Sequence, residues 1–181
     1  MASPETTPPS PTASVLLWDM AGTLIPYDPV SGRPSPLPGC DDFLPELSRD
    51  FRMVVTTGDG TASARAYLGN CEILPHMEAV FGDLTHPVGK PYGEILRQIG
   101  GDPSSSLAIG DRLRADIPAD TDQVVTLLIN QDGDIANAGM VAFMTHILRK
   151  QSGNFPEAFG LLAANAAPDP DREGPALSLI H

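Results

Sequence analysis

The chain has 181 residues, a length that allows one domain with a substantial core. Apolar residues make up 41% of it, which excludes wholesale disorder. Acidic residues outnumber basic ones by 23 to 11, so the formal net charge of −12 argues against nucleic acid and anionic membranes as partners.

Cysteine content and the lack of apolar segments indicate the compartment. Cys40 and Cys71 are the only cysteines, too few for a disulfide framework or a zinc site. Residues 1–14 contain no basic region followed by an apolar run, so we expect no secretory signal. No apolar stretch approaches the roughly 20 residues of a membrane helix. These features predict a cytoplasmic protein in a reducing environment.

The first predicted element follows a tail. Residues 1–13 are rich in Pro, Ser and Thr and cannot bury enough apolar surface to offset their ordering entropy, which predicts disorder. The apolar run Val15–Trp18 has the length of a buried strand, Asp19 ends it, and Gly22 favours a turn. A strand that delivers a carboxylate to such a turn is typical of the carboxyl edge of an open α/β sheet. A solvated Asp in an ordinary turn has the same pattern.

Strands and helices are predicted to alternate along the rest of the chain. The proline-rich stretch 25–39 is predicted to be a loop or flap over the first strand end. Further strands are predicted at Phe51–Thr57, Ala79–Phe81, Ser106–Ile109 and Val124–Ile129. Helices are predicted after a cap at Asp41, at Thr61–Leu68, at Pro91–Ile99 before Gly100, briefly around Asp116, at Ala136–Lys150 and at Asn154–Ala164.

This alternation predicts the α/β class, with a parallel sheet and helices on both of its faces. We expect residues 14–166 to form a single core domain. Residues 167–181 again carry Pro, Asp and Gly, and we expect a loose C-terminal tail there.

Polar residues follow three of the predicted strands. Asp19, Thr56 and Asp111 each stand at a strand end, where a parallel sheet brings ligand-binding residues together. Asp116 lies five residues beyond Asp111 and adds a third carboxylate. Carboxylates about 4 Å apart repel by several kcal/mol, so either some are protonated or a cation lies among them. Oxygen ligands suit a hard ion, with Mg²⁺ the usual one beside phosphate.

Other residues suit an anionic ligand. Lys90, in Gly-Lys-Pro, offers a positive charge, and Thr56 with the backbone amides of Thr57 and Gly58 offers donors to phosphate oxygens. A surface loop lysine and a strand-end threonine bonded to backbone are the simpler interpretations of these residues. A carboxylate nucleophile, a hydroxyl, a lysine and a metal-holding acid pair together suit phosphoryl transfer through an aspartyl-phosphate.

Four segments, in order, resemble the four motifs of the haloacid dehalogenase superfamily. They are Trp-Asp19-Met-Ala-Gly-Thr-Leu, Val-Val-Thr56-Thr-Gly, Gly-Lys90-Pro and Ile-Gly-Asp111-Arg-Leu-Arg-Ala-Asp116, within residues 15–129. The resemblance implies a Rossmann-like core and Mg²⁺-dependent phosphatase activity. It implies that Asp19 is the nucleophile and that Thr56 and Lys90 bind the transferring phosphoryl group. The implied metal ligands are Asp19, the backbone carbonyl of Ala21, Asp111 and Asp116, the last supporting Lys90 or a metal-bound water.

One position departs from the pattern. Phosphatases of this superfamily usually carry a second Asp two residues after the nucleophile, acting as general acid and base, and Ala21 stands there. Such a group raises the reaction rate by about 10²–10⁴-fold, so without it we expect slow turnover of substrates with poor leaving groups. His86 or Asp59 is a candidate replacement, although each is more simply a loop residue. Alanine at this position also resembles phosphonoacetaldehyde hydrolase, which uses a lysine of a cap domain to form a Schiff base.

The chain leaves little room for a cap domain. Residues 25–55 and 57–89 comprise 31 and 33 residues, most of which the core elements need. We therefore expect a capless protein with an open site. Its substrate would be a phosphorylated small molecule or protein, and a homo-oligomer or a partner chain would be able to cover the site.

Three functions from different classes stay open. The favoured one is a capless, slow phosphatase. The second is a non-catalytic binding or assembly protein that kept the fold. The third is a hydrolase of C–P bonds, which needs a lysine from elsewhere.

Overall fold

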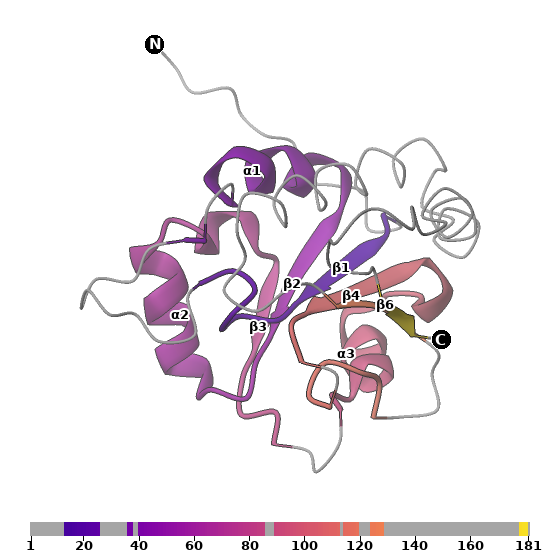
Figure 1. Ribbon diagram of the computed structural model, residues 1–181. Coiled ribbons are helices and arrows are strands. Elements are labelled where there is room, and N and C mark those ends of the chain that lie inside the picture. The colour runs from indigo at the N-terminus through magenta and orange to yellow at the C-terminus, as the bar shows by residue number, and fades with distance from the viewer. Residues whose placement is uncertain are drawn as a thin grey trace, which may run out of the picture.

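A sheet of parallel strands forms the centre of the computed structural model (Figure 1). The structure describes residues 13–25, 36–37, 40–85, 89–112, 114–119, 124–128 and 178–180. Across the sheet, the strands of this described part are β3 (Ala79–Phe81), β2 (Arg52–Thr56), β1 (Val15–Trp18), β4 (Ser106–Gly110), β5 (Val125–Leu128) and β6 (Ser178–Ile180). β1 to β5 pair in parallel, and β6 pairs antiparallel to β5. The predicted α/β class is confirmed.

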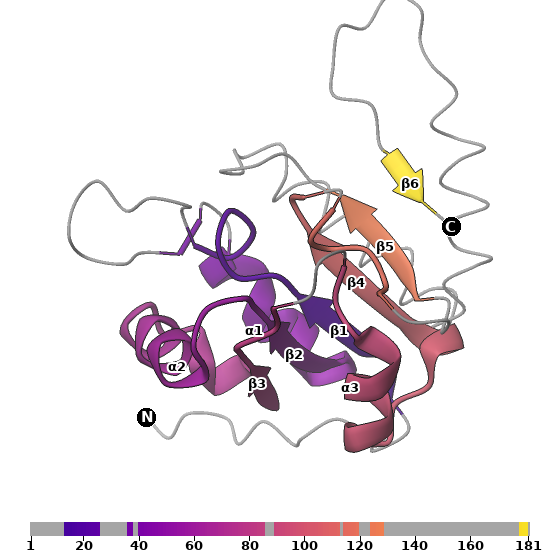
Figure 2. The same cartoon turned by 90° about the horizontal axis from the view of Figure 1, so that it is seen from below.

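Helices cover both faces of the sheet (Figures 1 and 2). The described α-helices are α1 (Cys40–Asp50), α2 (Thr61–Asn70) and α3 (Tyr92–Ile99), with 3₁₀ turns η1 (Leu74–His76) and η2 (Pro103–Ser105). α1 and α2 share one hydrophobic cluster with the sheet, and α3 shares a second one. Among the described residues, no helix has both the length and the apolar character needed to cross a membrane.

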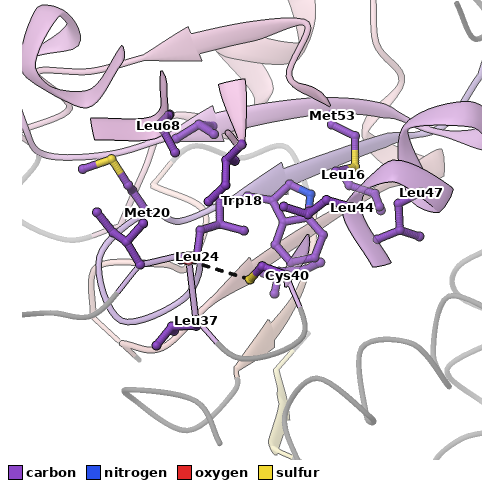
Figure 3. Packing of buried hydrophobic residues seen from close by; sticks show 14 of the residues in the cluster. Leu16, Trp18, Met20, Leu24, Leu37, Cys40, Leu44, Leu47, Met53 and Leu68 are labelled. Carbon is purple, nitrogen blue, oxygen red and sulfur yellow. Dashed lines mark hydrogen bonds between the residues drawn. The ribbon is translucent and has the colours of Figure 1, made fainter. Parts of the chain in front are cut away.

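The alternation of side chains along β1 builds both clusters. Leu16 and Trp18 belong to the cluster under α1 and α2, whereas Val15 and Leu17 belong to the cluster under α3. Successive residues of a strand point to opposite faces, so a strand covered on both sides is apolar throughout. In the first cluster, shown in Figure 3, the Trp18 ring stacks on Phe43 with centroids 5.9 Å apart. β1 is therefore the central strand that fixes where Asp19 emerges.

Two predicted helix details are wrong. Asp41 does not cap α1, because the helix begins at Cys40 and Asp41 already lies within it. The Cys40 N–H donates to the Leu37 carbonyl in the segment before the helix. The segment around Asp116 is a turn and not a helix, because the Asp116 carboxylate accepts hydrogen bonds from nearby backbone N–H groups. The four other predicted strands and the helices at α2 and α3 are present, β3 with the predicted ends and the others with ends that differ by at most two residues.

The described residues of the C-terminal region form a strand that was not predicted. β6 lies inside the segment expected to be a loose tail, and it pairs with β5 at the edge of the sheet. Such pairing satisfies backbone groups that an open edge would leave exposed. The helices predicted at 136–150 and 154–164, and residues 1–12, lie outside the described residues.

A buried arginine ties three elements together at the end of the sheet opposite Asp19. Arg52, the first residue of β2, donates from Nε and Nη2 to the two carboxylate oxygens of Glu78 at 2.8 and 2.6 Å. Its Nη2 also donates to the Ile99 carbonyl at the end of α3, at 2.6 Å. The planar guanidinium therefore links β2, the residue before β3 and the last turn of α3.

We expect Arg52→Lys to lower the free energy of unfolding by about 1–2 kcal/mol, because lysine cannot reproduce the bidentate pair and reach the carbonyl as well. Urea unfolding followed by circular dichroism measures this change. Arg65→Lys, at an exposed position of α2, is the matched control and should stay within about 0.5 kcal/mol of the wild type. Equal stability of the two variants would show that the Arg52 contacts contribute nothing net.

Candidate functional site

The candidate site lies at the carboxyl ends of three adjacent strands. Asp19 directly follows β1, Thr56 is the last residue of β2, and Asp111 directly follows β4. β1 pairs with both β2 and β4, so the three strand ends lie side by side. The structure thus brings together the residues that were singled out at strand ends.

The Lys90 ammonium lies at the centre of this edge. Its Nζ donates to Asp19 Oδ1 at 2.6 Å, to Asp116 Oδ1 at 2.6 Å and to the Thr56 carbonyl at 2.8 Å. An ammonium has three N–H donors, so these contacts use all of them. Only 5% of the Lys90 side chain is exposed, which makes both ion pairs buried ones.

Backbone contacts deliver Lys90 to this position. Its N–H donates to the Ile117 carbonyl and its own carbonyl accepts from Ala119, both at 2.8 Å. Gly89 has a φ of +74°, and a Cβ there would collide with the Ile117 carbonyl. Glycine before the lysine therefore lets the two segments meet as a short parallel bridge between Lys90 and Pro118.

Asp116 holds Lys90 and also shapes the turn that carries Asp111. While Oδ1 accepts from Lys90, Oδ2 accepts from the backbone N–H groups of Asp111 and Arg112 at 3.1 and 2.9 Å. The buried Tyr92 hydroxyl donates to the Asp116 carbonyl at 3.2 Å. Both carboxylate oxygens of Asp116 are thus engaged within the protein.

Asp111 contrasts with Asp116. Within the described part of the chain, neither of its buried carboxylate oxygens has a hydrogen-bond partner. One oxygen each from Asp19, Asp111 and Asp116 lies within 4.8 Å of the others. Gly22, with a φ of +86°, leaves open the space beside Asp111, because a Cβ there would lie 2.7 Å from Asp111 Oδ2. Carboxylate oxygens without a hydrogen-bond partner, beside the space that Gly22 leaves open, fit a hard divalent cation.

The surroundings raise the pKa of both outer carboxyls. Burial is the largest cause for Asp19, whose pKa rises to about 7 although Lys90 acts in the opposite direction. Burial also raises the pKa of Asp111, and the nearby Asp116 charge adds to the rise. A bound cation would stabilise the charged form of both carboxyl groups and so act against these shifts.

A pocket of about 390 Å³ opens in front of these groups. Thr57, Gly58 and Asp59, which follow β2, form one side of it. The Thr57 hydroxyl and the Asp59 carboxylate lie 3.3 Å apart in a hydrogen bond. The Thr56 side chain is fully buried, and its hydroxyl donates to the Trp18 carbonyl at 3.3 Å. Thr57, rather than Thr56, therefore presents its hydroxyl near the pocket.

A family model for haloacid dehalogenase-like hydrolases matches residues 29–119, just over half of the chain. The chain belongs to the haloacid dehalogenase-like hydrolases. The matched span includes Thr56, Lys90, Asp111 and Asp116, and it begins ten residues after Asp19.

Several solved structures are similar to this hydrolase. A haloacid dehalogenase-like family protein from Streptococcus pneumoniae shares 16% identity over 56% of this chain and 77% of its own, with a TM-score of 0.47. A protein named as a β-phosphoglucomutase from Thermotoga maritima shares 13% identity over 55% of this chain and 76% of its own, with a TM-score of 0.47. The core domain of a protein named as a phosphoglycolate phosphatase from Streptococcus pneumoniae shares 13% identity over 73% of this chain and 96% of its own, with a TM-score of 0.46. A search of curated proteins finds no match.

Sequence reasoning missed several residues of this hydrolase's site. Arg112 lines the pocket, with 44% of its side chain exposed, and Leu84 lines it from the segment after β3. The Thr23 hydroxyl lies 3.5 Å from Asp19 Oδ2. Arg112 stands next to Asp111 in a chain with few basic residues, and this position could have identified it as a pocket residue. Nothing in the sequence pointed to Leu84. His86 lies outside the described residues.

We expect Lys90→Met to cost this hydrolase about 3–5 kcal/mol of stability, because two buried carboxylates then face each other without a counter-charge. Asp116→Asn removes one of those charges. The double variant should be more stable than the sum of the single changes predicts, by about 1–3 kcal/mol. Urea unfolding of all four proteins measures the coupling. Additive changes would mean that the ammonium does not balance these carboxylates.

Proposed function

We propose that this hydrolase is a Mg²⁺-dependent phosphatase that forms an aspartyl-phosphate on Asp19. One observation carries the proposal. The Lys90 ammonium bridges Asp19 and Asp116 at the wall of a pocket, beside an Asp111 carboxylate that accepts no hydrogen bond from any described residue. This is the combination of nucleophile, fixed positive charge and vacant acidic oxygens that phosphoryl transfer uses.

The two oxygens of Asp19 have different surroundings, which suggests different roles. Oδ1 is held by Lys90 at 2.6 Å, whereas Oδ2 has only the distant Thr23 hydroxyl at 3.5 Å. In the proposed reaction Oδ2 attacks phosphorus, and the bond from phosphorus to the leaving-group oxygen breaks. Water then attacks phosphorus, the Asp19 oxygen leaves, and inorganic phosphate departs. Lys90 keeps Asp19 aligned during both steps.

Mg²⁺ fits the acidic end of the site. Asp19 and Asp111 would hold it, and the Ala21 carbonyl, whose residue lines the pocket, is proposed as a further ligand. When bound, the ion would neutralise the phosphoryl oxygens and draw Asp19 and Asp111 into their charged forms. Asp116 was also predicted as a ligand, but its two oxygens already bind Lys90 and the turn. We therefore propose that Asp116 supports Lys90 and is not itself a metal ligand.

The other side of the phosphoryl group would meet the segment after β2. Thr57 and Gly58 line the pocket there and are proposed phosphate-binding residues. Thr56 keeps a proposed role through its carbonyl, which holds Lys90. Direct binding by its hydroxyl requires that the hydroxyl turn away from the Trp18 carbonyl.

Ala21 leaves the proton transfer to another group. An alanine cannot protonate the leaving oxygen or take a proton from the attacking water. Asp59 lines the same pocket and is the candidate that the structure describes. Since its carboxylate is also bonded to Thr57, we propose that it substitutes poorly and that the enzyme is slow.

The shape of the chain around the pocket supports an open, capless site. Between β2 and Gly89 the described residues form α2, η1 and β3, which are core elements. Such a site accepts a phosphorylated small molecule or a phosphorylated protein segment. A homo-oligomer or another chain would supply any cover.

Of the two alternatives, a non-catalytic binding protein is favoured by Ala21, which removes the proton-transfer group. Hydrolysis of C–P bonds is the weaker one because it needs a free lysine. The sequence contains two lysines, Lys90 and Lys150. All three donors of Lys90 are engaged, so this chemistry would require Lys150 or a lysine from another chain.

We expect the hydrolysis rate to depend steeply on the acidity of the leaving group. Acetyl phosphate and p-nitrophenyl phosphate should be hydrolysed with Mg²⁺, whereas alkyl phosphates should be nearly inert, because only the latter need a proton as they leave. Ala21→Asp should raise alkyl phosphate turnover by one to several orders of magnitude, toward the roughly 10²–10⁴-fold of a positioned acid. Asp19→Asn should abolish hydrolysis of every substrate, because the asparagine side chain has nearly the same size as aspartate but its amide is a poor nucleophile.

Three outcomes would contradict this account. Hydrolysis that persists in Asp19→Asn would remove the aspartyl-phosphate. Wild-type hydrolysis of alkyl and aryl phosphates at equal rates, without a gain from Ala21→Asp, would show that another residue supplies the proton. Asp59→Asn then tests the first candidate. No hydrolysis of any substrate, with Mg²⁺ bound, would favour the binding protein.

A further inference from the structure

We infer that Tyr92 is a positioning residue of this hydrolase's site, because its buried hydroxyl holds the backbone of Asp116 and, through Asp116, the Lys90 ammonium. Tyr92 is not among the described residues that line the pocket, so its effect on a ligand is indirect. The inference rests on the proposed function only for the effect of this alignment on hydrolysis. The alignment itself belongs to the folded protein and is measured without a substrate.

The place of Tyr92 in the fold is set by the core. It is the first residue of α3, two residues after Lys90, and its N–H donates to the Lys90 carbonyl at 2.9 Å. Its side chain is buried in the hydrophobic cluster that α3 shares with the sheet, together with Ile95 and Leu96 of the same helix. Side chains in a close-packed core are held in defined rotamers. The packing of the ring therefore fixes where the hydroxyl lies.

The short segment 90–92 holds Asp116 at two points. The Tyr92 hydroxyl donates to the Asp116 carbonyl at 3.2 Å, and the Lys90 ammonium donates to Asp116 Oδ1 at 2.6 Å. The first contact fixes the backbone from which the Asp116 side chain extends, and the second joins that side chain to the ammonium. A shift of the Asp116 backbone would therefore move the Lys90 ammonium relative to Asp19 Oδ1, which lies 2.6 Å from it.

The Tyr92 hydroxyl stays a donor at neutral pH. Burial, followed by the charges of Asp116 and Asp19, raises the pKa of Tyr92 well above its usual range. Asp116 is only 1% exposed, so water has little access to replace this donor. A buried carbonyl that loses its donor is costly, and the backbone is expected to shift in order to regain a partner.

The test compares the same substitution at two tyrosines. Tyr92→Phe removes the hydroxyl and keeps the ring that packs in the core, so the fold should survive, which circular dichroism checks. Tyr67→Phe is the matched control on α2, where the tyrosine is 42% exposed. Nuclear magnetic resonance of protein carrying ¹⁵N at the lysine Nζ atoms then reports on the ammonium groups directly. The sequence contains two lysines, and Lys150→Arg identifies the signal of Lys90.

We expect Tyr92→Phe to shift the Lys90 ammonium signal and to speed its hydrogen exchange by at least about 5-fold, because the buried hydrogen bonds that protect it are loosened. Tyr67→Phe should leave both unchanged. With Mg²⁺ and p-nitrophenyl phosphate, Tyr92→Phe should lower kcat roughly 5- to 10-fold, the range of one hydrogen bond, and keep KM within about 2-fold of the wild type. Lost stability alone would change neither the ammonium signal nor the kcat of the folded protein.

The two readouts separate the inference from the proposed function. A Lys90 ammonium signal and exchange rate that are the same in Tyr92→Phe and the wild type would overturn the inference, and intact hydrolysis would leave the phosphatase standing. A changed Lys90 signal in Tyr92→Phe, in a protein whose wild type hydrolyses no phosphate ester, would uphold the positioning role and overturn the phosphatase.

Discussion

The Lys90 ammonium is buried between the carboxylates of Asp19 and Asp116, and the geometry and charge balance of the rest of the site depend on it. Taking such charges out of water costs several kcal/mol each, and the cost is offset only when geometry and hydrogen bonding are good. Here all three ammonium donors are used, and Asp116 shares its second oxygen with the turn after β4. The turn, Lys90 and Asp19 are therefore held as one unit. Loss of Lys90 would leave two buried carboxylates without their counter-charge.

The charges of this unit favour a cation beside it. Lys90 supplies one positive charge to two carboxylates, and Asp111 adds a third acid close by. The raised pKa values of Asp19 and Asp111 express the imbalance, since burial and neighbouring negative charge disfavour their ionised forms. A divalent ion would reverse this and would leave Asp19 ionised, as the proposed reaction requires. Ala21 changes none of these charges, so under the proposed function it affects proton transfer alone.

The sequence predicted the central part of this arrangement because it depends on local patterns. Val15–Trp18 is apolar at every position, as a strand covered on both faces must be, and a polar residue directly after it marks the strand end. The bonds of Lys90 could not be predicted from local pattern, because Asp19 and Asp116 lie 71 and 26 residues away along the chain. The strand order brought the carboxylates together and offered Lys90 as a positive charge, and the resemblance to a family added that Asp116 supports Lys90.

One wrong prediction and one that stays a prediction involve the same physical effect. Asp116 was expected on a short helix, but its side chain bonds to backbone N–H groups four and five residues earlier and folds the segment into a turn. Thr56 stays a predicted phosphate-binding residue, while its hydroxyl bonds to the neighbouring strand and Thr57 lines the pocket. In both cases a polar side chain satisfies a nearby backbone group, a choice that residue type alone does not reveal.

The most direct test of this account is calorimetric titration of Mg²⁺ into the wild type, Asp111→Asn and Asp59→Asn. Asp59 lines the same pocket but lies outside the cluster of three acids, which makes it the matched control. The account predicts one Mg²⁺ per wild-type chain, binding weakened by at least about 10-fold in Asp111→Asn, and an affinity in Asp59→Asn close to that of the wild type. Wild-type protein that binds no Mg²⁺ at millimolar concentration, or Asp111→Asn that binds it as tightly as the wild type, would contradict it.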